Sequence, residues 1–185
     1  MPFLTLRRRF VLLAAACCTV HVAVAAPPPE GCDPGVLACQ ALGGFVASAV
    51  RINVTRKDAN TAYQGVRTTI RLFNHGPRPL VLAYREGSSR VSDDNGNVYG
   101  WRRAEVAGIG VVSRGKADAQ FVLASGESRE FSVDGVLQYS RARTVAGNVF
   151  THDLTLVEMQ PISPTQVRMV RDHLLSFTNL TGGRP

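Results

Sequence analysis

From Phe45 onward, apolar and polar side chains alternate with a period of two residues. Within residues 66–72, the even-numbered positions are apolar or threonine, whereas two of the odd-numbered positions are arginine. Such alternation is typical of strands that bury one face of a sheet and expose the other to water. The same rhythm predicts further strands over residues 45–54, 80–84, 97–101, 109–113, 119–123, 130–134, 148–159 and 166–178.

In the stretch 45–54, the alternation places five side chains on one face of the expected strand, which are Val46, Ser48, Val50, Ile52 and Val54. Turn-forming residues separate the expected strands, at positions 74–77, 94–96, 125–126, 146–148 and 161–164. No long pattern with a helical period competes. About eight closely spaced strands predict an all-β, antiparallel β-sandwich.

Residues 1–25 have the pattern of an export signal. Three consecutive arginines at 7–9 precede an apolar run that starts at Phe10, and small residues at 23–25 fit the rule for signal peptidase. This pattern predicts cleavage before Ala26. Because a short, arginine-rich signal is typical of bacteria, we expect the mature protein in the periplasm or secreted from the cell.

Two alternatives to a cleaved signal remain at the N-terminus. A membrane anchor would need about twenty unbroken apolar residues, and this run is interrupted by Thr19 and His21. A lipoprotein signal would acylate Cys17, although the preceding leucine lies one position too far away for a good match. We therefore favour cleavage, and expect no membrane span in the mature chain.

Two cysteines remain after the signal, because Cys17 and Cys18 fall within it. In an oxidising compartment, Cys32 and Cys39 are expected to form a disulfide. Zinc is the alternative, but two cysteines without a nearby histidine supply only half of a ligand set.

The segment before the first expected strand has the signals of a short helix over residues 34–42. Asp33 is a good N-cap, Pro34 suits the first turn, and two glycines at 43–44 would end the helix. Such a helix would bring Cys39 back toward Cys32.

Composition fits a globular chain of one domain. The 185 residues are 45% apolar and 19% charged, so they resemble neither a disordered nor a collagen-like sequence. Removal of the signal takes away three arginines and no acid, which lowers the net charge from +7 to +4. That charge is too small to indicate a nucleic-acid partner without a supporting motif. The expected organisation is a signal peptide (1–25), an N-terminal segment (26–44), the β-sandwich (45–180) and a tail (181–185).

Several short motifs resemble secreted bacterial immunoglobulin-like (telokin-like) domains of unknown function. Residues 69–74 followed by 78–82 are similar to a strand that ends in an Asn turn and a strand that opens with proline. Residues 93–99 are similar to the family's polar hairpin, and residues 121–128 to its strand and Gly-Glu turn. The resemblance covers about residues 45–178. It implies an immunoglobulin-like sandwich outside the cytoplasm and carries over no catalytic residues.

Candidate catalytic groups are sparse. His75 lies in an expected turn, whereas His152 and His173 lie in the last two expected strands, with Asp153 and Asp172 beside them. If these two strands form a hairpin, the histidines and aspartates would approach one another and would form a candidate metal or proton-transfer cluster. We favour ordinary strand positions for them.

Other catalytic motifs are missing from the sequence. No serine lies in a GxSxG motif, although a Ser-His-Asp triad assembled across the fold stays open. Gly108-Ile109-Gly110 lacks the lysine and the serine or threonine of a phosphate-binding loop. We interpret it as the entry to a strand, or as a bulge.

Residues 93–97 combine two aspartates, two asparagines and a glycine. Calcium would need oxygen ligands at alternate positions and a later glutamate, but position 102 is arginine. Asn95-Gly96 is instead a strong signal for a type I′ hairpin turn, which we favour over a loose calcium site.

One candidate binding surface combines Tyr99, Trp101, Arg102 and Arg103. The two aromatic residues would share a face of a strand and stack on a sugar or a protein partner, with the arginines supplying polar contacts. The alternative, which we favour, places Trp101 in the core. Four further basic residues would attract an anion or a membrane surface, or would simply form a solvated face. They are Arg114, Lys116, Arg141 and Arg143.

We expect a non-enzymatic accessory or structural module of the bacterial envelope, which binds another protein through a sheet edge or through residues 97–115. The alternatives are a small-ligand or carbohydrate-binding module that uses Tyr99 and Trp101, and an enzyme or metal-binding protein. No cofactor or metal is expected. A long, unprotected apolar edge would favour the protein partner.

Overall fold

The computed structural model describes residues 32–55, 64–100, 106–114, 116–137, 145–163 and 166–182. All regular structure in these residues is β-strand, as the alternation predicts. None of them forms an apolar helix of membrane-spanning length. The expected signal peptide at 1–25 and the last three residues of the expected tail lie outside this part of the chain.

The described chain forms thirteen strands, several of them only two to four residues long, instead of the eight expected. In chain order they are β1 (Ala38–Leu42), β2 (Phe45–Thr55), β3 (Gly65–Asn74), β4 (Leu80–Arg85), β5 (Arg90–Asp93), β6 (Val98–Gly100), β7 (Val106–Ala107), β8 (Gly110–Ser113), β9 (Lys116–Ala117), β10 (Val122–Leu123), β11 (Ser128–Leu137), β12 (Val149–Ser163) and β13 (Gln166–Thr181).

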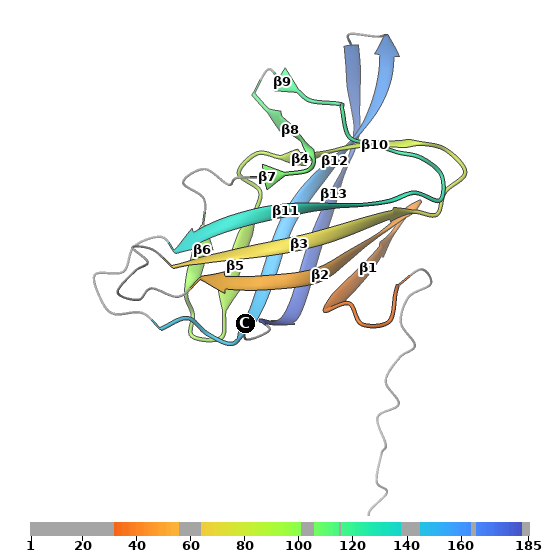
Figure 1. Ribbon diagram of the computed structural model, residues 1–185. Helices are drawn as coiled ribbons and strands as arrows, with labels where there is room; N and C mark the ends of the chain where they lie inside the picture. The colour runs from red at the N-terminus through yellow and green to blue at the C-terminus, as the bar shows by residue number, and fades with distance from the viewer. Residues whose placement is uncertain are drawn as a thin grey trace, which may run out of the picture.

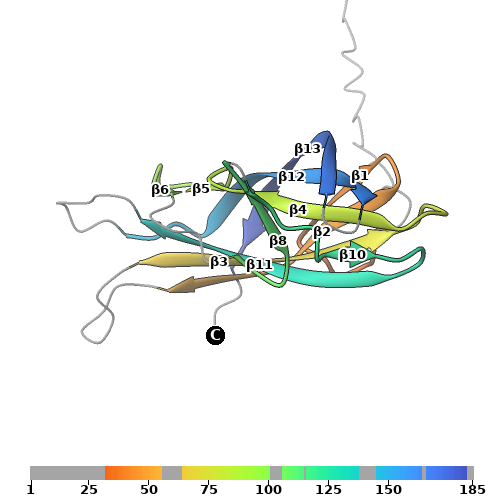
Figure 2. The same ribbon diagram turned by 90° about the horizontal axis from the view of Figure 1, so that it is seen from above.

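Hydrogen bonding joins the strands into one continuous sheet in the order β1-β2-β3-β11-β6-β5-β12-β4-β8-β9, with β13 beside β12, β10 beside β4 and β7 beside β11 (Figure 1). The sheet folds over on itself into two layers, with β3 and β11 in one and β4, β5 and β12 in the other (Figure 2). The pairs are antiparallel except for β4 and β8, which are parallel. The sheet was expected to be purely antiparallel, and it departs from that expectation at this one parallel pair of strands.

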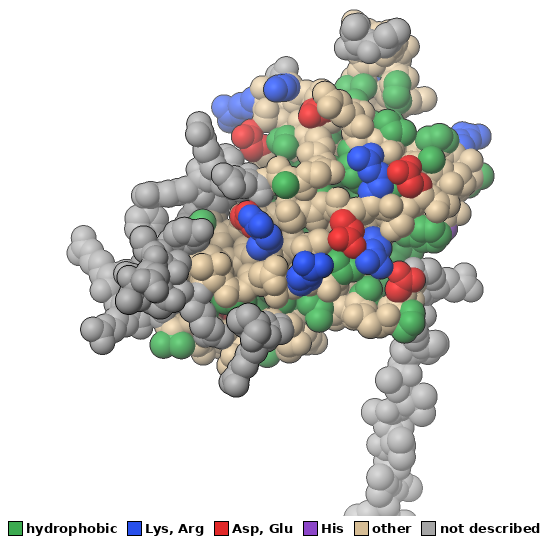
Figure 3. Space-filling model, viewed as in Figure 1, with side chains coloured by type: hydrophobic (Ala, Val, Ile, Leu, Met, Phe, Trp, Pro, Cys, Tyr) green, Lys and Arg blue, Asp and Glu red, His purple; other side chains and the backbone are tan. Residues whose placement is uncertain are grey.

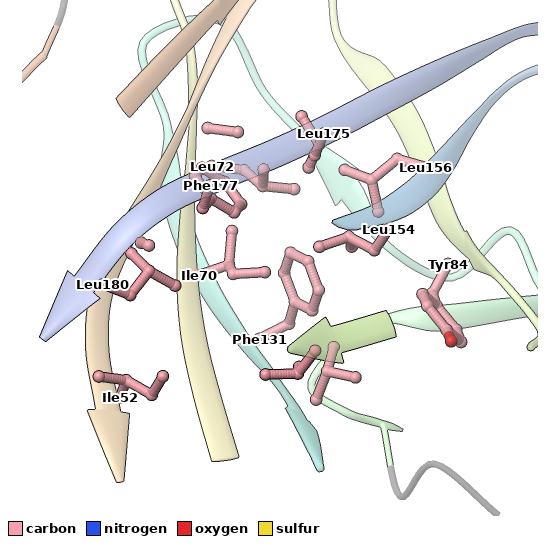
Figure 4. Close-up of a cluster of buried hydrophobic side chains, with 14 of the residues drawn as sticks. Ile52, Ile70, Leu72, Tyr84, Phe131, Leu154, Leu156, Leu175, Phe177 and Leu180 are labelled. Atoms are coloured by element: carbon pink, nitrogen blue, oxygen red, sulfur yellow. The ribbon is translucent and has the colours of Figure 1, made fainter. Parts of the chain in front are cut away.

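The main core, a cluster of buried apolar side chains, fills the space between the two layers (Figure 4). Ile70 and Leu72 of β3 point toward this space from one layer, and Leu154 and Leu156 of β12 from the other. Each such side chain contributes about 1.5–3 kcal/mol when it is fully buried. The alternation predicted for β3 is confirmed, because its even-numbered positions are the buried ones.

A second, smaller apolar cluster lies on the other face of β4 and β12 and extends to the neighbouring strand β8. It contains Val81, Ala83, Val112, Val157 and Met159. Because β4 also turns its alternate side chains to the main core, both of its faces are buried. The expectation of one solvated face is therefore wrong for this strand.

The predicted face of β2 is interrupted by a β-bulge. The register with β3 shifts between Ala49 and Arg51, so Val50 is an extra residue in the ladder. A bulge reverses which alternate positions face inward. Ala49 and Ile52 therefore both pack into the main core, and the prediction of one face running from Val46 to Val54 is wrong.

The short helix expected over residues 34–42 is absent, and strand β1 occupies most of that segment. Gly35 adopts a φ of +93°, which a right-handed helix excludes, and Pro34-Gly35 forms a turn instead. From Ala38 onward, β1 pairs with β2 over five residue pairs. The predicted disulfide between Cys32 and Cys39 is nevertheless present, with the two Cα atoms 6.0 Å apart.

Candidate functional site: the hairpin of β12 and β13

The hairpin of β12 and β13 contains the longest strands of the described chain, with 15 and 16 residues. On its other side, β12 pairs with β5 through residues 150–153 and with β4 through residues 156–159. No other described strand pairs with the hairpin beyond Met159. Residues 160–163 and 166–168 therefore project from the body of the molecule (Figure 1), and together with residues 169–171 they are called the hairpin end below.

Exposed apolar side chains gather on this hairpin. The relative exposure is 63% for Ile162, 49% for Met169, 50% for Val170 and 67% for Leu174. They make up half of the large apolar side chains that are exposed in the described residues. Because apolar clusters of this kind are typical of surfaces that bind another molecule, the hairpin is a candidate docking element.

Among the described strands, only β12 pairs with β13, and the side chain of Gln40 in β1 caps part of the other edge of β13. The Gln40 amide Nε2 donates to the carbonyl of Leu174 (3.2 Å), and the N–H of Ser176 donates to Gln40 Oε1 (3.0 Å). These two contacts show which backbone groups of β13 point outward. Since alternate residues of a strand point their N–H and C=O to the same side, those of Asp172 also face this open edge, given the regular register from 171 to 175.

The hairpin end is positively charged, because the sequence has no acidic residue between Glu158 and Asp172 but has two arginines there. Arg168 donates to the side-chain oxygen of Gln160 (2.6 Å), and Arg171 is exposed. Neither arginine forms an ion pair with a described acidic side chain, and both flanking acids already have partners. Glu158 contacts His173 (2.9 Å), and Asp172 forms an ion pair with Arg85.

The two histidines of the hairpin do not come together. The ring of His173 contacts Glu158, whereas His152 is paired with Phe177 in the ladder and forms a hydrogen bond with Ser89 Oγ (2.8 Å). Asp153 bonds instead to the hydroxyl of Ser176. Across the described residues, no three His, Cys, Asp or Glu side chains gather as a ligand set for a metal.

Ser89 and His152 are the one described pair that resembles a nucleophile with a base. Complete burial of the imidazole lowers the pKa of His152 to about 4, an effect that the charge of Asp153 only partly offsets. An imidazole with so low a pKa draws a proton weakly from a serine hydroxyl. No described side chain bonds to His152 Nδ1, so the acid of a triad is missing from this pair. The geometry favours a structural role.

Asp93 is the centre of a buried hydrogen-bond network at the end of β5. Its Oδ2 accepts bonds from Asn97 Nδ2 (2.7 Å), the Tyr99 hydroxyl (2.9 Å) and the N–H of Gly147 (2.8 Å). Burial alone would raise the pKa of Asp93, but these bonds outweigh it and hold the pKa below its usual value. Burial also raises the pKa of Tyr99 to about 12.

The turn at residues 93–97 is a hairpin, but it is not of type I′. Of its residues, only Gly96 has a positive φ, whereas type I′ needs positive φ at two successive positions. The N–H of Gly96 bonds to the carbonyl of Asp93, and that of Asp93 bonds to the carbonyl of Asn97. This pattern is a type I turn followed by a left-handed glycine. Because donors occupy both oxygens of Asp93, its carboxylate is a poor calcium ligand.

Tyr99 does not display its ring on the surface. The side chain is 1% exposed, its hydroxyl accepts a bond from Gln64 (2.9 Å), and its ring packs near Phe150 in the main core. Its three partners in the candidate binding surface, Trp101, Arg102 and Arg103, lie outside the described residues. The candidate sugar-binding surface of Tyr99 and Trp101 therefore lacks one of its two aromatic rings.

The charged outer face of β3 and β11 is neutralised by its own ion pairs. Arg67 contacts both oxygens of Asp134 at 2.6 Å, and Arg71 contacts Glu130 at 2.8 Å. On the face viewed in Figure 3, blue basic and red acidic side chains lie next to one another. Among the other basic candidates, Arg114 and Lys116 are exposed, whereas residues 141 and 143 lie outside the described part.

A shallow hollow of about 280 Å³ lies between the turn before β8 and the start of β11, beside Phe121 and Arg129. The guanidinium of Arg129 stacks 4.6 Å above the Phe121 ring and donates to the carbonyl of Val122. A Cβ at Gly110 would collide with the backbone of Asp118. Gly108-Ile109-Gly110 therefore allows a close approach of two backbone segments, consistent with the expected strand entry.

Three structural residues were missed by sequence reasoning: Gln40, Asn74 and Asp93. Asn74 is completely buried and donates to the carbonyls of Arg78 (2.9 Å) and Leu123 (3.0 Å). The only sequence signal was that Asn74 and Asp93 sit at expected turns. Nothing in the sequence distinguishes Gln40 from other polar side chains of a strand.

No protein-family model matches the chain, and neither does any curated protein. Among solved structures, the chain is similar to the ASH / PapD-like domain of human CEP192 (PapD-like domain 7), with 13% sequence identity and a TM-score of 0.33. The match covers 89% of this chain and 100% of that domain. Too little of the backbone superposes at this TM-score to say anything about function.

Proposed function

We propose that this chain is an exported, non-enzymatic β-sandwich of the immunoglobulin-like type, which acts as an accessory or structural protein-binding module of the bacterial envelope. The N-terminal signal pattern supports export, and the disulfide between Cys32 and Cys39 fits an oxidising compartment. The export pathway ends in the periplasm or outside the cell.

One observation carries the proposal: half of the exposed, large apolar side chains of the described residues lie on a single hairpin that projects beyond its neighbouring strands. Exposed apolar area on a projecting element gains free energy when a partner buries it. The alternative, a carbohydrate-binding module built on Tyr99 and Trp101, is weaker because the Tyr99 ring lies in the core.

Site-specific photocrosslinking in the native envelope tests the proposal. A photoreactive residue is placed at Met169 on the hairpin or, as a control, at the exposed Asn53 of β2. We expect a discrete protein adduct from position 169 that disappears when Leu174→Glu is added, and no adduct from position 53. Equal adducts at the two positions, or none at 169, would contradict a docking role for the hairpin.

A further inference from the structure

Resting on the proposed function, we propose that the partner contributes an extended, acidic segment that adds to the open edge of β13 as an extra strand. The added segment lies along residues 168–172 and stops where the Gln40 amide occupies the edge.

Backbone geometry supports addition of a strand. The N–H and C=O of Asp172 point to an edge on which no described strand pairs, while the same groups further along are capped by Gln40. Gln40 bridges a carbonyl and the N–H two residues later, which is how a residue of a neighbouring parallel strand would pair. The edge thus already forms hydrogen bonds with an amide group that does not belong to β12. The backbone amides of an added strand can form the next hydrogen bonds, at Asp172 and toward residue 168.

The side chains beside this edge select the chemistry of the segment. Arg168 and Arg171 lack an acidic partner among the described residues, and Met169 and Val170 are half exposed. A segment with carboxylates on one face and apolar side chains on the other satisfies both sets. The two arginines also attract such a segment electrostatically, and this attraction weakens as salt increases.

A membrane surface and a second copy of this chain fit the same edge less well. A bilayer offers no donors or acceptors in its apolar region for the unpaired backbone groups of β13. Two copies joined through the same edge would bring their arginines together, and the stretch from 159 to 171 has no acid to offset them. A protein segment with carboxylates meets both requirements.

The test uses the purified mature protein and three labelled ten-residue peptides. The first alternates valine and glutamate, the second replaces glutamate by lysine, and the third is the acidic peptide with alternate backbone nitrogens methylated. Fluorescence anisotropy measures their binding, and vesicles of phosphatidylglycerol and phosphatidylcholine are compared by sedimentation. Analytical ultracentrifugation reports self-association.

Two variants are matched at one position. Asp172→Pro removes an N–H that points to the open edge and leaves the ladder with β12 intact, whereas Asp172→Ala keeps that N–H. Both lose the ion pair with Arg85. The second set combines Arg168→Glu with Arg171→Glu, which reverses the charge of the edge. Thermal unfolding shows whether each variant folds.

We expect the acidic peptide to bind and the methylated and lysine peptides to bind at least about tenfold more weakly, which is the effect of one lost hydrogen bond or charge contact. Asp172→Pro should weaken binding by about the same factor relative to Asp172→Ala. The double charge reversal should shift the preference to the lysine peptide. If Asp172→Pro fails to fold, strand addition is tested by the binding of the methylated peptide and by the peptide preference of the charge-reversed variant.

Several results would overturn strand addition. They are equal binding by Asp172→Pro and Asp172→Ala, equal binding of the methylated peptide, binding of phosphatidylglycerol vesicles alone, and self-association through this edge. If the Met169 crosslink persists in any of these cases, the docking role stands and only the mode of binding is wrong. Absence of that crosslink counts against the docking role itself.

Discussion

Buried polar side chains fix the loops of this sandwich, and each works through partners that are distant in sequence. Asn74 holds the turn after β3 against β10 by donating to the carbonyl of Leu123. Asp93 receives the N–H of Gly147, 54 residues away. Such groups are stable inside a core only when their hydrogen bonds are satisfied. The sequence marks both as turn residues, but their burial depends on the tertiary partners that meet them.

His152 predicts a dependence of stability on acid. Its pKa in the folded protein is about 4, below its usual value of 6.5, so the unfolded chain binds the proton more readily. The stabilising contribution of the neutral imidazole is complete above pH 6.5 and is lost as the pH falls toward 4, by at most about 1.4 kcal/mol per pH unit. His152→Phe should flatten this part of the pH profile in urea unfolding.

The control for this measurement is His75→Asn, because His75 is exposed in the turn after β3. Its profile should retain the wild-type slope between pH 6.5 and 4. Identical slopes for wild type and His152→Phe would mean that the imidazole is not buried in its neutral form. Carboxylates also titrate at the lower end of this range, so the difference between the profiles isolates His152.

At the level of elements, the inward face was predicted correctly for strands with regular alternation and wrongly for β2, which has a local irregularity. β3 and β11 keep one inward face along their length, and their alternation matches the sequence. In β2, the extra residue Val50 changes the inward face, and a bulge leaves no clear sequence signal. Before β1, Asp33 and Pro34 are residues that favour the start of a helix. Gly35, however, has a positive φ, so the chain forms a turn there and continues as a strand.

The edge of β13 gives a prediction for hydrogen exchange. The N–H of Ser176 is held by the side chain of Gln40 rather than by a neighbouring strand. In Gln40→Ala, this amide should exchange about fivefold faster, since one hydrogen bond contributes about 1 kcal/mol. The amide of Leu175, whose neighbours in β12 are unchanged, serves as the internal reference. Unchanged exchange at Ser176 would show that Gln40 does not protect this edge.

The whole molecule combines a continuous sheet, folded into two layers, with a disulfide between Cys32 and Cys39 near its first strand. The all-β class followed from the two-residue period alone. The number of strands did not, because several of them have only two or three residues and are defined by the partners they pair with. The exposed apolar side chains on the hairpin of β12 and β13 were not predicted either, since exposure of an apolar strand residue depends on where its neighbours end.

Export and oxidation predict one mass for the mature protein. Protein recovered from the envelope should begin near Ala26 and should take up no alkylating label before reduction and two labels after it, at Cys32 and Cys39. Intact mass spectrometry with and without reductant measures both properties. Mature material that retains Arg7 to Arg9, or that is labelled twice without reduction, would contradict this organisation.

The disulfide at the start of β1 has a consequence for the order of assembly. The cytoplasm keeps thiols reduced, so a chain made there and then exported crosses the membrane with both sulfurs free. In the proposed exported chain, the bond can therefore close only after translocation. Formation of the disulfide then fixes the position of β1, the strand whose Gln40 side chain bonds to β13. A folding intermediate trapped before this step would have a finished sandwich and a loose first strand.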